Sequence, residues 1–268
     1  MELKYITNSN REAWNEVTPI HQKARKVNLK EKFKVEGFSI LDKYETEKLV
    51  DIPIKGKHVA QLCCNNGSET LSLINLGADS GVGFDISDEA IKEALELAEI
   101  SGLNCDFIRT DVYDIGEEYY NQFDFIYITI GALTWLPDLN IFFSIVSKML
   151  KDSGKIMIYD SHPITDIFLY ENEEGFDSDN PLKIVNSYFR TEPWIDNDGI
   201  DYIGKTRYKS ETTYSFTYRL SDVFNAVIRN GIVIEEFYEN PHHLSPEHAP
   251  LEKGHKIPLS YILIGQKQ

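Results

Sequence analysis

The sequence predicts an α/β fold, because apolar segments of strand length alternate with amphipathic helical segments over most of the chain. Residues 59–63 form a short, mostly apolar segment, which a turn, a helical segment and a second short strand follow. Residues 123–130 form a nearly continuous apolar segment, which is typical of a central parallel strand buried on both faces. Both observations predict a mostly parallel sheet at the centre of the molecule.

Length and composition narrow the class of protein. The 268 residues fit one large domain with room for a small insert. The 27 basic and 43 acidic residues give a net charge of −16, which argues against a large nucleic-acid-binding surface. Cys63, Cys64 and Cys105 cannot form a disulfide framework, so they favour a reducing, cytoplasmic setting. The N-terminus lacks the apolar core of a signal peptide, and no segment has the length of a membrane span, so we expect no membrane association.

The N-terminal region is expected to be helical. Residues 8–17 predict a helix that is capped by Ser9 or Asn10 and limited by Pro19. The basic segment that follows is either a solvated helix face, which we favour, or a site for an anion or polynucleotide. Its basic residues are Lys23, Arg25, Lys26, Lys30, Lys32 and Lys34.

The turn after the first strand is the first candidate for a binding site. Asn and Gly at residues 65–67 tolerate positive φ, and the helix that follows ends at Gly77. Backbone N–H groups and a helix N-terminus at this turn are open to a polar or charged group of a ligand. The second strand, residues 81–84, ends in Asp85, and a carboxylate about 20 residues after such a turn can accept both hydroxyls of a ribose. This arrangement predicts a site for an adenosine-like ligand. Only Gly67 remains of a G-x-G-x-x-G fingerprint, so no glycine cradle for a pyrophosphate is expected.

The later elements continue the alternation of strands and helices. Ser87 is expected to cap a helix that Gly102 ends, and a third strand then leads to Asp111. The remaining expected elements are the third strand at residues 105–110, a helix around residues 142–149, a strand at 155–159, a helix at 221–230, and strands at 232–237 and 259–264.

Residues 166–219 interrupt this alternation. Two strand-like stretches, residues 184–190 and 212–219, flank a turn signal at 197–199 and predict an inserted antiparallel hairpin. Such an insert is placed to build a substrate pocket. Tyr188, Trp194 and Tyr208 are candidates for an aromatic wall, with a small core of the insert itself as the alternative.

The turn and the two acidic residues resemble motifs of the class I S-adenosylmethionine (SAM)-dependent methyltransferases. The first motif of that family is an acid followed by x-Gly-x-Gly-x-Gly, and here Gln61, Cys63 and Asn65 replace the acid and two of the glycines. Asp85 matches the acid that holds the ribose, and Asp111 matches the carboxylate that takes the adenine amino group. Residues 128–139 are similar to the fourth-motif region of small-molecule members. The resemblance covers residues 50–159 and 221–267.

This resemblance implies a Rossmann-like, seven-stranded, mostly parallel sheet with helices on both faces, an N-terminal helical lid and a β-rich insert. The expected divisions are an N-terminal lid at residues 1–49, a SAM-binding α/β core at 50–165, a substrate insert at 166–219, and the rest of the core at 220–268. Trp14 and His21 are candidate lid residues. The candidate cofactor-binding residues are Gln61, Cys63, Asn65, Gly67, Asp85, Ile86, Asp111, Val112, Ile130, Gly131 and Leu133.

The implied function is SAM-dependent methyl transfer to a small-molecule acceptor. His162 is the candidate general base because histidine titrates near neutral pH, with the ordering of the Pro163 turn as the alternative. His242, His243, His248 and His255 lack diagnostic ligand spacing, so no metal is expected. The alternative functions are RNA- or protein-directed methylation and non-catalytic binding of SAM or a nucleoside. A homodimer is compatible with the sequence.

Overall fold

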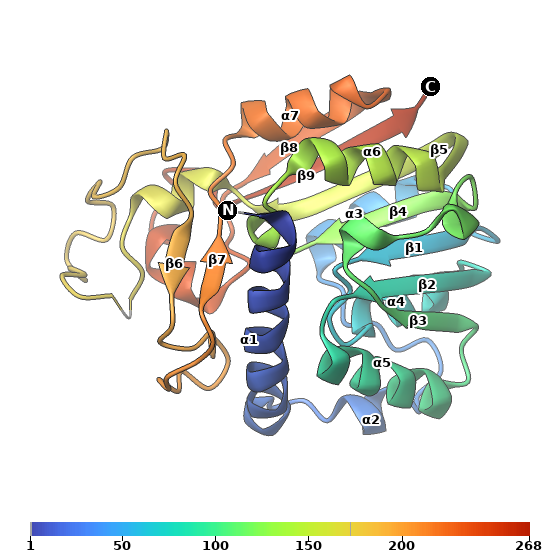
Figure 1. Ribbon diagram of the computed structural model, residues 1–268, viewed down its shortest axis with the longest axis horizontal. Coiled ribbons are helices and arrows are strands. Elements are labelled where there is room, and N and C mark those ends of the chain that lie inside the picture. The colour runs from blue at the N-terminus through green and yellow to red at the C-terminus, as the bar shows by residue number, and fades with distance from the viewer. Residues whose placement is uncertain (1, 172) are drawn as a thin grey trace.

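The computed structural model describes residues 2–171 and 173–268, and its centre is a seven-stranded sheet (Figure 1). The strands in spatial order are β3 (Cys105–Arg109), β2 (Ser80–Asp85), β1 (His58–Leu62), β4 (Phe123–Thr129), β5 (Leu150–Ser161), β9 (Ser260–Lys267) and β8 (Ile232–Asn240). The pairs β1–β2, β2–β3, β1–β4 and β4–β5 are parallel, whereas β9 is antiparallel to both β5 and β8. The predicted fold class, a seven-stranded and mostly parallel sheet, is therefore confirmed.

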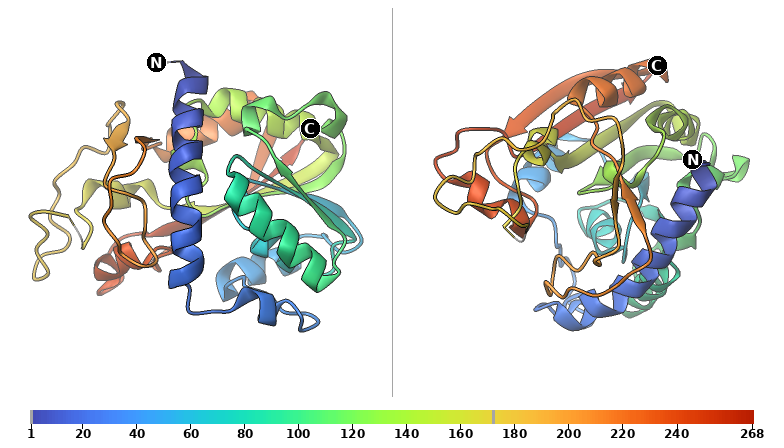
Figure 2. Two further views of the ribbon diagram at one scale, coloured as in Figure 1. Left: turned by 60° about the horizontal axis from the view of Figure 1, so that its bottom comes forward. Right: turned by 60° about the vertical axis from the view of Figure 1, so that its left-hand side comes forward.

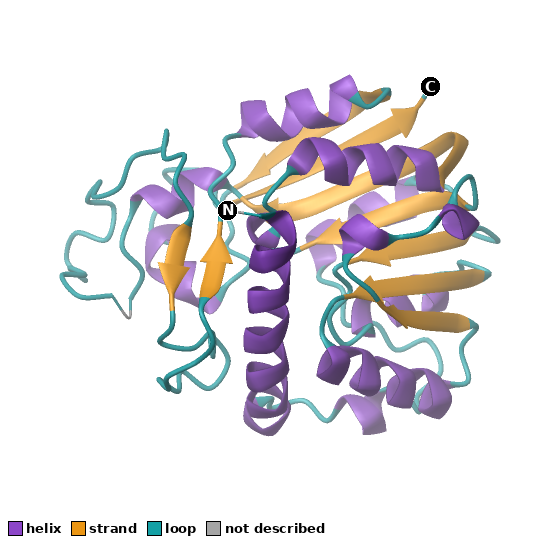
Figure 3. Cartoon of the chain, in the orientation of Figure 1, coloured by secondary structure: helices purple, strands orange, loops and turns teal. Residues whose placement is uncertain are grey.

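Helices cover both faces of the sheet (Figure 3). On one face α6 (Leu139–Met149) and α7 (Leu220–Arg229) contribute to a large apolar cluster with β4 and β5. On the other face the apolar clusters involve α2 (Leu29–Lys32), α3 (Lys43–Asp51), α4 (Ser68–Asn75) and α5 (Asp88–Ser101). The short 3-10 helices are η1 (Val112–Asp114), η2 (Glu117–Tyr119), η3 (Leu133–Trp135), η4 (Pro163–Ile167) and η5 (Pro246–Glu252).

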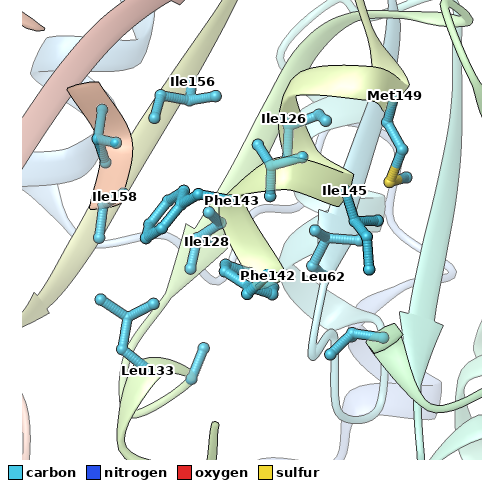
Figure 4. Close-up of a cluster of buried hydrophobic side chains, with 14 of the residues drawn as sticks. Leu62, Ile126, Ile128, Leu133, Phe142, Phe143, Ile145, Met149, Ile156 and Ile158 are labelled. Atoms are coloured by element: carbon cyan, nitrogen blue, oxygen red, sulfur yellow. The ribbon is translucent and has the colours of Figure 1, made fainter. Parts of the chain in front are cut away.

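The apolar character of β4 and β5 explains their central position. Ile126 and Ile128 of β4 and Ile156 of β5 are fully buried and face Phe142 and Phe143 of α6 (Figure 4). Burial of a side chain of this size contributes about 1.5–3 kcal/mol to folding. The packed strands form a rigid edge from which the following loops extend.

The first helix differs from its prediction. Helix α1 (Leu3–Ala24) continues through Pro19, and Ser9 and Asn10 lie inside the helix instead of capping it. The Asn10 amide pairs with both backbone groups of Tyr214, at 2.9 and 2.8 Å, so it binds a neighbouring strand. Contacts of α1 with α5 and with the strand that contains Tyr214 hold the helix together across the proline. The local preference of proline to end a helix could not show these contacts.

The insert forms a smaller hairpin than predicted. Strands β6 (Trp194–Asp196) and β7 (Thr213–Ser215) pair antiparallel, and α1 lies between this hairpin and α5 (Figure 1, Figure 2). The predicted strand at residues 184–190 is wrong, because this stretch forms turns and leaves Ile184 and Phe189 exposed. Its backbone has no partner strand to bind, so apolar content alone did not make it a strand.

A buried carboxyl group joins α3 to the sheet. Glu45 is 3 % exposed, accepts a hydrogen bond from the Asp42 backbone N–H at 2.7 Å, and accepts another from the Tyr127 hydroxyl. Burial, with the nearby charge of Glu69, raises the pKa of Glu45 to about 8. The carboxyl group is therefore mostly protonated at neutral pH.

We expect this group to make the protein less stable at high pH. Because the pKa of Glu45 is about 8 in the folded state and 4.5 in the reference state, the folded chain holds the extra proton within that window. Its contribution is complete below the unfolded pKa and is lost as pH rises through the folded one, at up to about 1.4 kcal/mol per pH unit. In urea unfolding from pH 5 to 9, Glu45→Gln is expected to flatten the decline, and the exposed Glu47→Gln is expected to leave it unchanged. An unchanged decline in Glu45→Gln would show that another group causes it.

Candidate active site

A cavity of about 1090 Å³ lies at the carboxyl ends of the parallel strands. In open α/β sheets ligands bind at this edge. Loops after β1, β2, β3, β4 and β5 form the base of the cavity, and α1, the insert and residues 244–248 line the rest. Ligand pockets are typically about 300–1000 Å³, so this cavity has room for a cofactor and a second molecule.

The turn after β1 keeps a backbone that glycine would adopt readily. Cys63, Asn65 and Gly67 have φ values of 56°, 49° and 70°, so all three alternate positions of the first motif are left-handed. Cys63 and Asn65 line the cavity. Gly67 lies outside the lining: a Cβ there would stand 2.2 Å from the Phe107 ring, so this glycine permits close packing of the turn on β3. Burial raises the pKa of the Cys63 thiol well above its usual value, which keeps it neutral.

Asp85 is held at the end of β2 with its carboxylate at the cavity. Its Oδ2 accepts a hydrogen bond from Asn65 N at 2.7 Å, and its Oδ1 accepts one from Ser87 N at 2.8 Å. Burial raises the pKa of Asp85, and these N–H donors oppose that rise. A carboxylate has about four acceptor positions, so oxygen lone pairs remain for two hydroxyls. Ile86 lines the cavity beside it.

Asp111 occupies the equivalent position after β3. Its Oδ1 accepts a hydrogen bond from Tyr113 N at 3.1 Å and caps η1. Its Oδ2 accepts one from Lys4 Nζ at 2.8 Å, which ties the start of α1 to the cavity edge. Asp111 and Val112 both line the cavity.

The loop after β4 is held by an acid that the sequence analysis did not select. Gly131, with φ of 76°, donates its N–H to Asp160 Oδ1 at 2.6 Å. The Ser161 N–H donates to the same oxygen at 2.8 Å. Burial raises the pKa of Asp160 to about 6. Ile130, Gly131 and Leu133 line the cavity as a result. The sequence signal that would have identified Asp160 is its place directly after the apolar part of β5.

Gln61 lies outside the cavity lining, so its role as a cofactor ligand stays a prediction. The side chain is fully buried and donates hydrogen bonds to Glu69 Oε2 at 2.5 Å and Thr129 Oγ1 at 2.7 Å. The Thr70 hydroxyl donates to Gln61 Oε1 at 2.6 Å. Glu69 and Thr129 do line the cavity, so the hydrogen bonds of Gln61 hold two lining residues in position. Sequence analysis missed Glu69 because it lies within a helix and not in a loop.

His162 is likewise absent from the cavity lining, although Ser161 and Pro163 belong to it, so its role as a general base stays a prediction. Its Nδ1 accepts a hydrogen bond from Ile164 N at 3.1 Å, which caps η4. Its Nε2 lies 3.1 Å from Glu239 Oε1 on the far strand β8. Both ring nitrogens are therefore engaged, and the alternative role of ordering the Pro163 turn accounts for the residue.

Three of the four C-terminal histidines have clearly different environments. His242 stacks on Tyr44 at 3.6 Å, His243 lies 3.5 Å from Glu252, and His248 packs beside Tyr170. Within residues 2–171 and 173–268, no group of three or more His, Cys, Asp or Glu residues could hold a metal ion. Over the same residues, no helix combines the length and apolar character that crossing a membrane requires.

One face of α1 covers part of the cavity. Thr7, Asn10, Trp14, His21 and Arg25 recur at helical spacing and line it. Trp14 also contacts Trp135 of η3, with ring centroids 5.4 Å apart. Half of the six basic residues at positions 23–34 form ion pairs: Arg25, Lys30 and Lys34 pair with Glu93, Glu96 and Glu31. Tyr188 and Tyr208 lie outside the lining, whereas Trp194 is part of it.

Comparison with known proteins agrees with this geometry. The methyltransferase domain family matches residues 54–195, just over half of the chain. No curated protein sequence matches.

Solved structures share the fold at low sequence identity. A SAM-dependent methyltransferase from Mesorhizobium loti is 18% identical, with a TM-score of 0.62, over 84% of this chain and 97% of that one. Magnesium protoporphyrin IX methyltransferase from Synechocystis, with bound S-adenosylhomocysteine (SAH), is 16% identical, with a TM-score of 0.59, over 98% and 99%. Geranyl diphosphate C-methyltransferase from Streptomyces coelicolor is 10% identical, with a TM-score of 0.55, over 84% and 78%.

The residues of this cavity fit the cofactor of that family. Carboxylates at the ends of β2 and β3, each held by backbone N–H groups, are suited to a ribose diol and an adenine amino group. The turn after β1 keeps its left-handed backbone in spite of the missing glycines. The chain belongs to the class I SAM-dependent methyltransferases, enzymes that use SAM as the methyl donor.

Proposed function

We propose that this enzyme transfers the methyl group of SAM to a small-molecule acceptor enclosed in the cavity. The observation that carries the proposal is the cover formed by α1 and the insert over a cavity large enough for two molecules. A protein or RNA acceptor needs an open approach to the methyl group. The fold neighbours with protoporphyrin and geranyl diphosphate in their names support a small acceptor.

We assign cofactor contacts to residues that line the cavity. Asp85 would accept the ribose hydroxyls, with Ile86 packed beside the ring. Asp111 and the Val112 backbone would bind adenine. Cys63 and Asn65 would offer backbone groups to the methionine part, and Ile130, Gly131 and Leu133 would lie near the reacting atoms.

In this reaction the protein would mainly hold the two reactants in position and would contribute no nucleophile of its own. Bound SAM supplies a methyl group on a sulfonium, which is already a good leaving group. Asp160 would hold the Gly131 loop in place, and α1 would exclude water. Alignment of two reactants in this way gives a large rate gain without a nucleophilic side chain. A cytoplasmic setting is supported by the free thiols of Cys63, Cys64 and Cys105.

The test is a transfer assay with methyl-labelled SAM. The purified chain is incubated with a metabolite extract below 1 kDa, with total RNA or with total protein, using roughly equal amounts of each. Label is expected in the metabolite fraction. Label in RNA or protein would overturn the small-molecule proposal. SAM binding without transfer to any fraction would favour the non-catalytic alternative.

A further inference from the structure

One part of the cavity lining, outside the residues assigned to the cofactor, is acidic. We call Asp166, Tyr170, Glu173, Glu247 and His248 the acidic pocket, and all five line the cavity. Asp166 belongs to η4, which directly follows β5 and Asp160. The pocket therefore adjoins the loop that we place near the reacting atoms.

Hydrogen bonds hold the carboxylate of Asp166 in a fixed orientation. Its Oδ2 accepts from the Thr217 hydroxyl at 2.7 Å, and its Oδ1 accepts from the Tyr170 hydroxyl at 3.1 Å. Thr217 in turn accepts from the Trp194 indole N–H at 3.1 Å. These partners are neutral, so the negative charge of Asp166 has no cation paired with it among them.

The acidic groups of the pocket repel one another. Burial and the charge of Glu173 raise the pKa of Asp166 and of Glu247, although Lys205 opposes the rise for Glu247. Lys205 also forms an ion pair with Glu171, at 3.3 Å, so its positive charge does not act on Glu247 alone. Such a group of carboxylates would be stabilised by a further positive charge.

His248 gives a second, independent indication of a ligand. Its ring is 6 % exposed, and its Nδ1 has no hydrogen-bond partner within the described part of the chain. Burial lowers the pKa of His248 to about 4, so the ring is neutral at pH 7. The Tyr170 ring lies 5.0 Å from it. A neutral imidazole beside an aromatic ring and carboxylates suits an organic cation with N–H groups and apolar parts.

We propose that the acidic pocket recognises a protonated amine, so that the methyl acceptor is a small organic cation. Because an ammonium nitrogen has no lone pair, this group anchors the acceptor, and a different atom with a free lone pair attacks the methyl group as SAH leaves. The proposal rests on the proposed function, because it assigns the acceptor class of the same cavity. Asp166 would accept from the ammonium group, Glu173 and Glu247 would add negative charge around it, and the Tyr170 ring would contact its substituents.

The test compares three probes of similar shape and different charge. The chain is saturated with SAH and titrated by calorimetry with benzylamine, benzyl alcohol or benzoate at pH 7. Benzylamine is expected to bind at least roughly tenfold more tightly than benzyl alcohol, with benzoate weakest, because charge-assisted hydrogen bonds are the strong ones. Equal binding of the three, tighter binding of benzoate, or no binding of any would overturn the proposal.

Single-residue variants test whether the preference for the amine comes from the acidic pocket. Asp166→Asn and Glu247→Gln are each expected to reduce the preference for the amine by about tenfold. Asp179→Asn, an exposed acid of the same insert outside the lining, is the matched control and is expected to keep the preference. Glu247→Gln keeps the test valid if Asp166→Asn fails to fold. A preference that survives both pocket variants would contradict the proposal.

The same experiment distinguishes a failure of the proposed acceptor class from a failure of the proposed function. SAH binding is measured first in every variant. If SAH binds and the amine does not, the acceptor class is wrong and the small-molecule function stands. If SAH fails to bind to the folded wild type, the proposed function fails, and the acceptor class fails with it.

Discussion

Asp85→Ala is expected to bind SAM and SAH roughly 100-fold more weakly than the wild type, because each charge-assisted hydrogen bond contributes about 1.5–3 kcal/mol. The variant loses the proposed acceptor of both ribose hydroxyls. It also loses the acceptor that holds Asn65 N at 2.7 Å, so the turn after β1 becomes less ordered. Calorimetric titration with both ligands measures the effect.

The matched control for this variant is Asp79→Asn. Asp79 is exposed and precedes β2, so it lies at the opposite end of the same strand from Asp85. Its affinity for SAM is expected to equal that of the wild type. Unchanged affinity in Asp85→Ala, in a chain that folds, would show that the ribose is held elsewhere.

Gly67→Ala is expected to lower the free energy of unfolding by about 3 kcal/mol, from the sum of overpacking and backbone strain. A Cβ at this position would stand 2.2 and 2.3 Å from two atoms of the Phe107 ring. The φ of 70° adds the cost of a left-handed conformation for a residue with a side chain. Urea unfolding at a single pH measures the loss.

Gly102→Ala separates the two causes. Gly102 also has a positive φ, of 65°, but a Cβ there would meet nothing within 4 Å. Its loss is expected to be about 1 kcal/mol, from backbone strain alone. The double variant Gly67→Ala with Phe107→Leu is expected to recover part of the loss, since the smaller side chain leaves room. Equal losses in the two glycine variants would mean that the clash with Phe107 is relieved at little cost.

Local patterns were sufficient for most of the architecture. The apolar run of β4, the cap at Ser87 and the glycines that end helices each depend on neighbours a few residues away. The Asp85 and Asp111 positions also followed from local order, since an acid directly after a parallel strand must lie at the carboxyl edge of the sheet. These features were therefore predictable from one sequence.

Only the tertiary structure decided which polar side chains reach the cavity. Gln61 lies near the carboxyl end of β1 and His162 directly follows β5, yet Glu69 and Glu239 on other elements engage them. Asp160, two residues before His162, holds the Gly131 loop instead. The continuation of α1 through Pro19 and the orientation of Asp166 also depend on distant partners, since Asn10 binds Tyr214 and Asp166 accepts from Thr217. Sequence alone determined the strands of the central sheet and their order along the chain because backbone periodicity is local, whereas the direction and partner of each side chain were set by packing between distant elements.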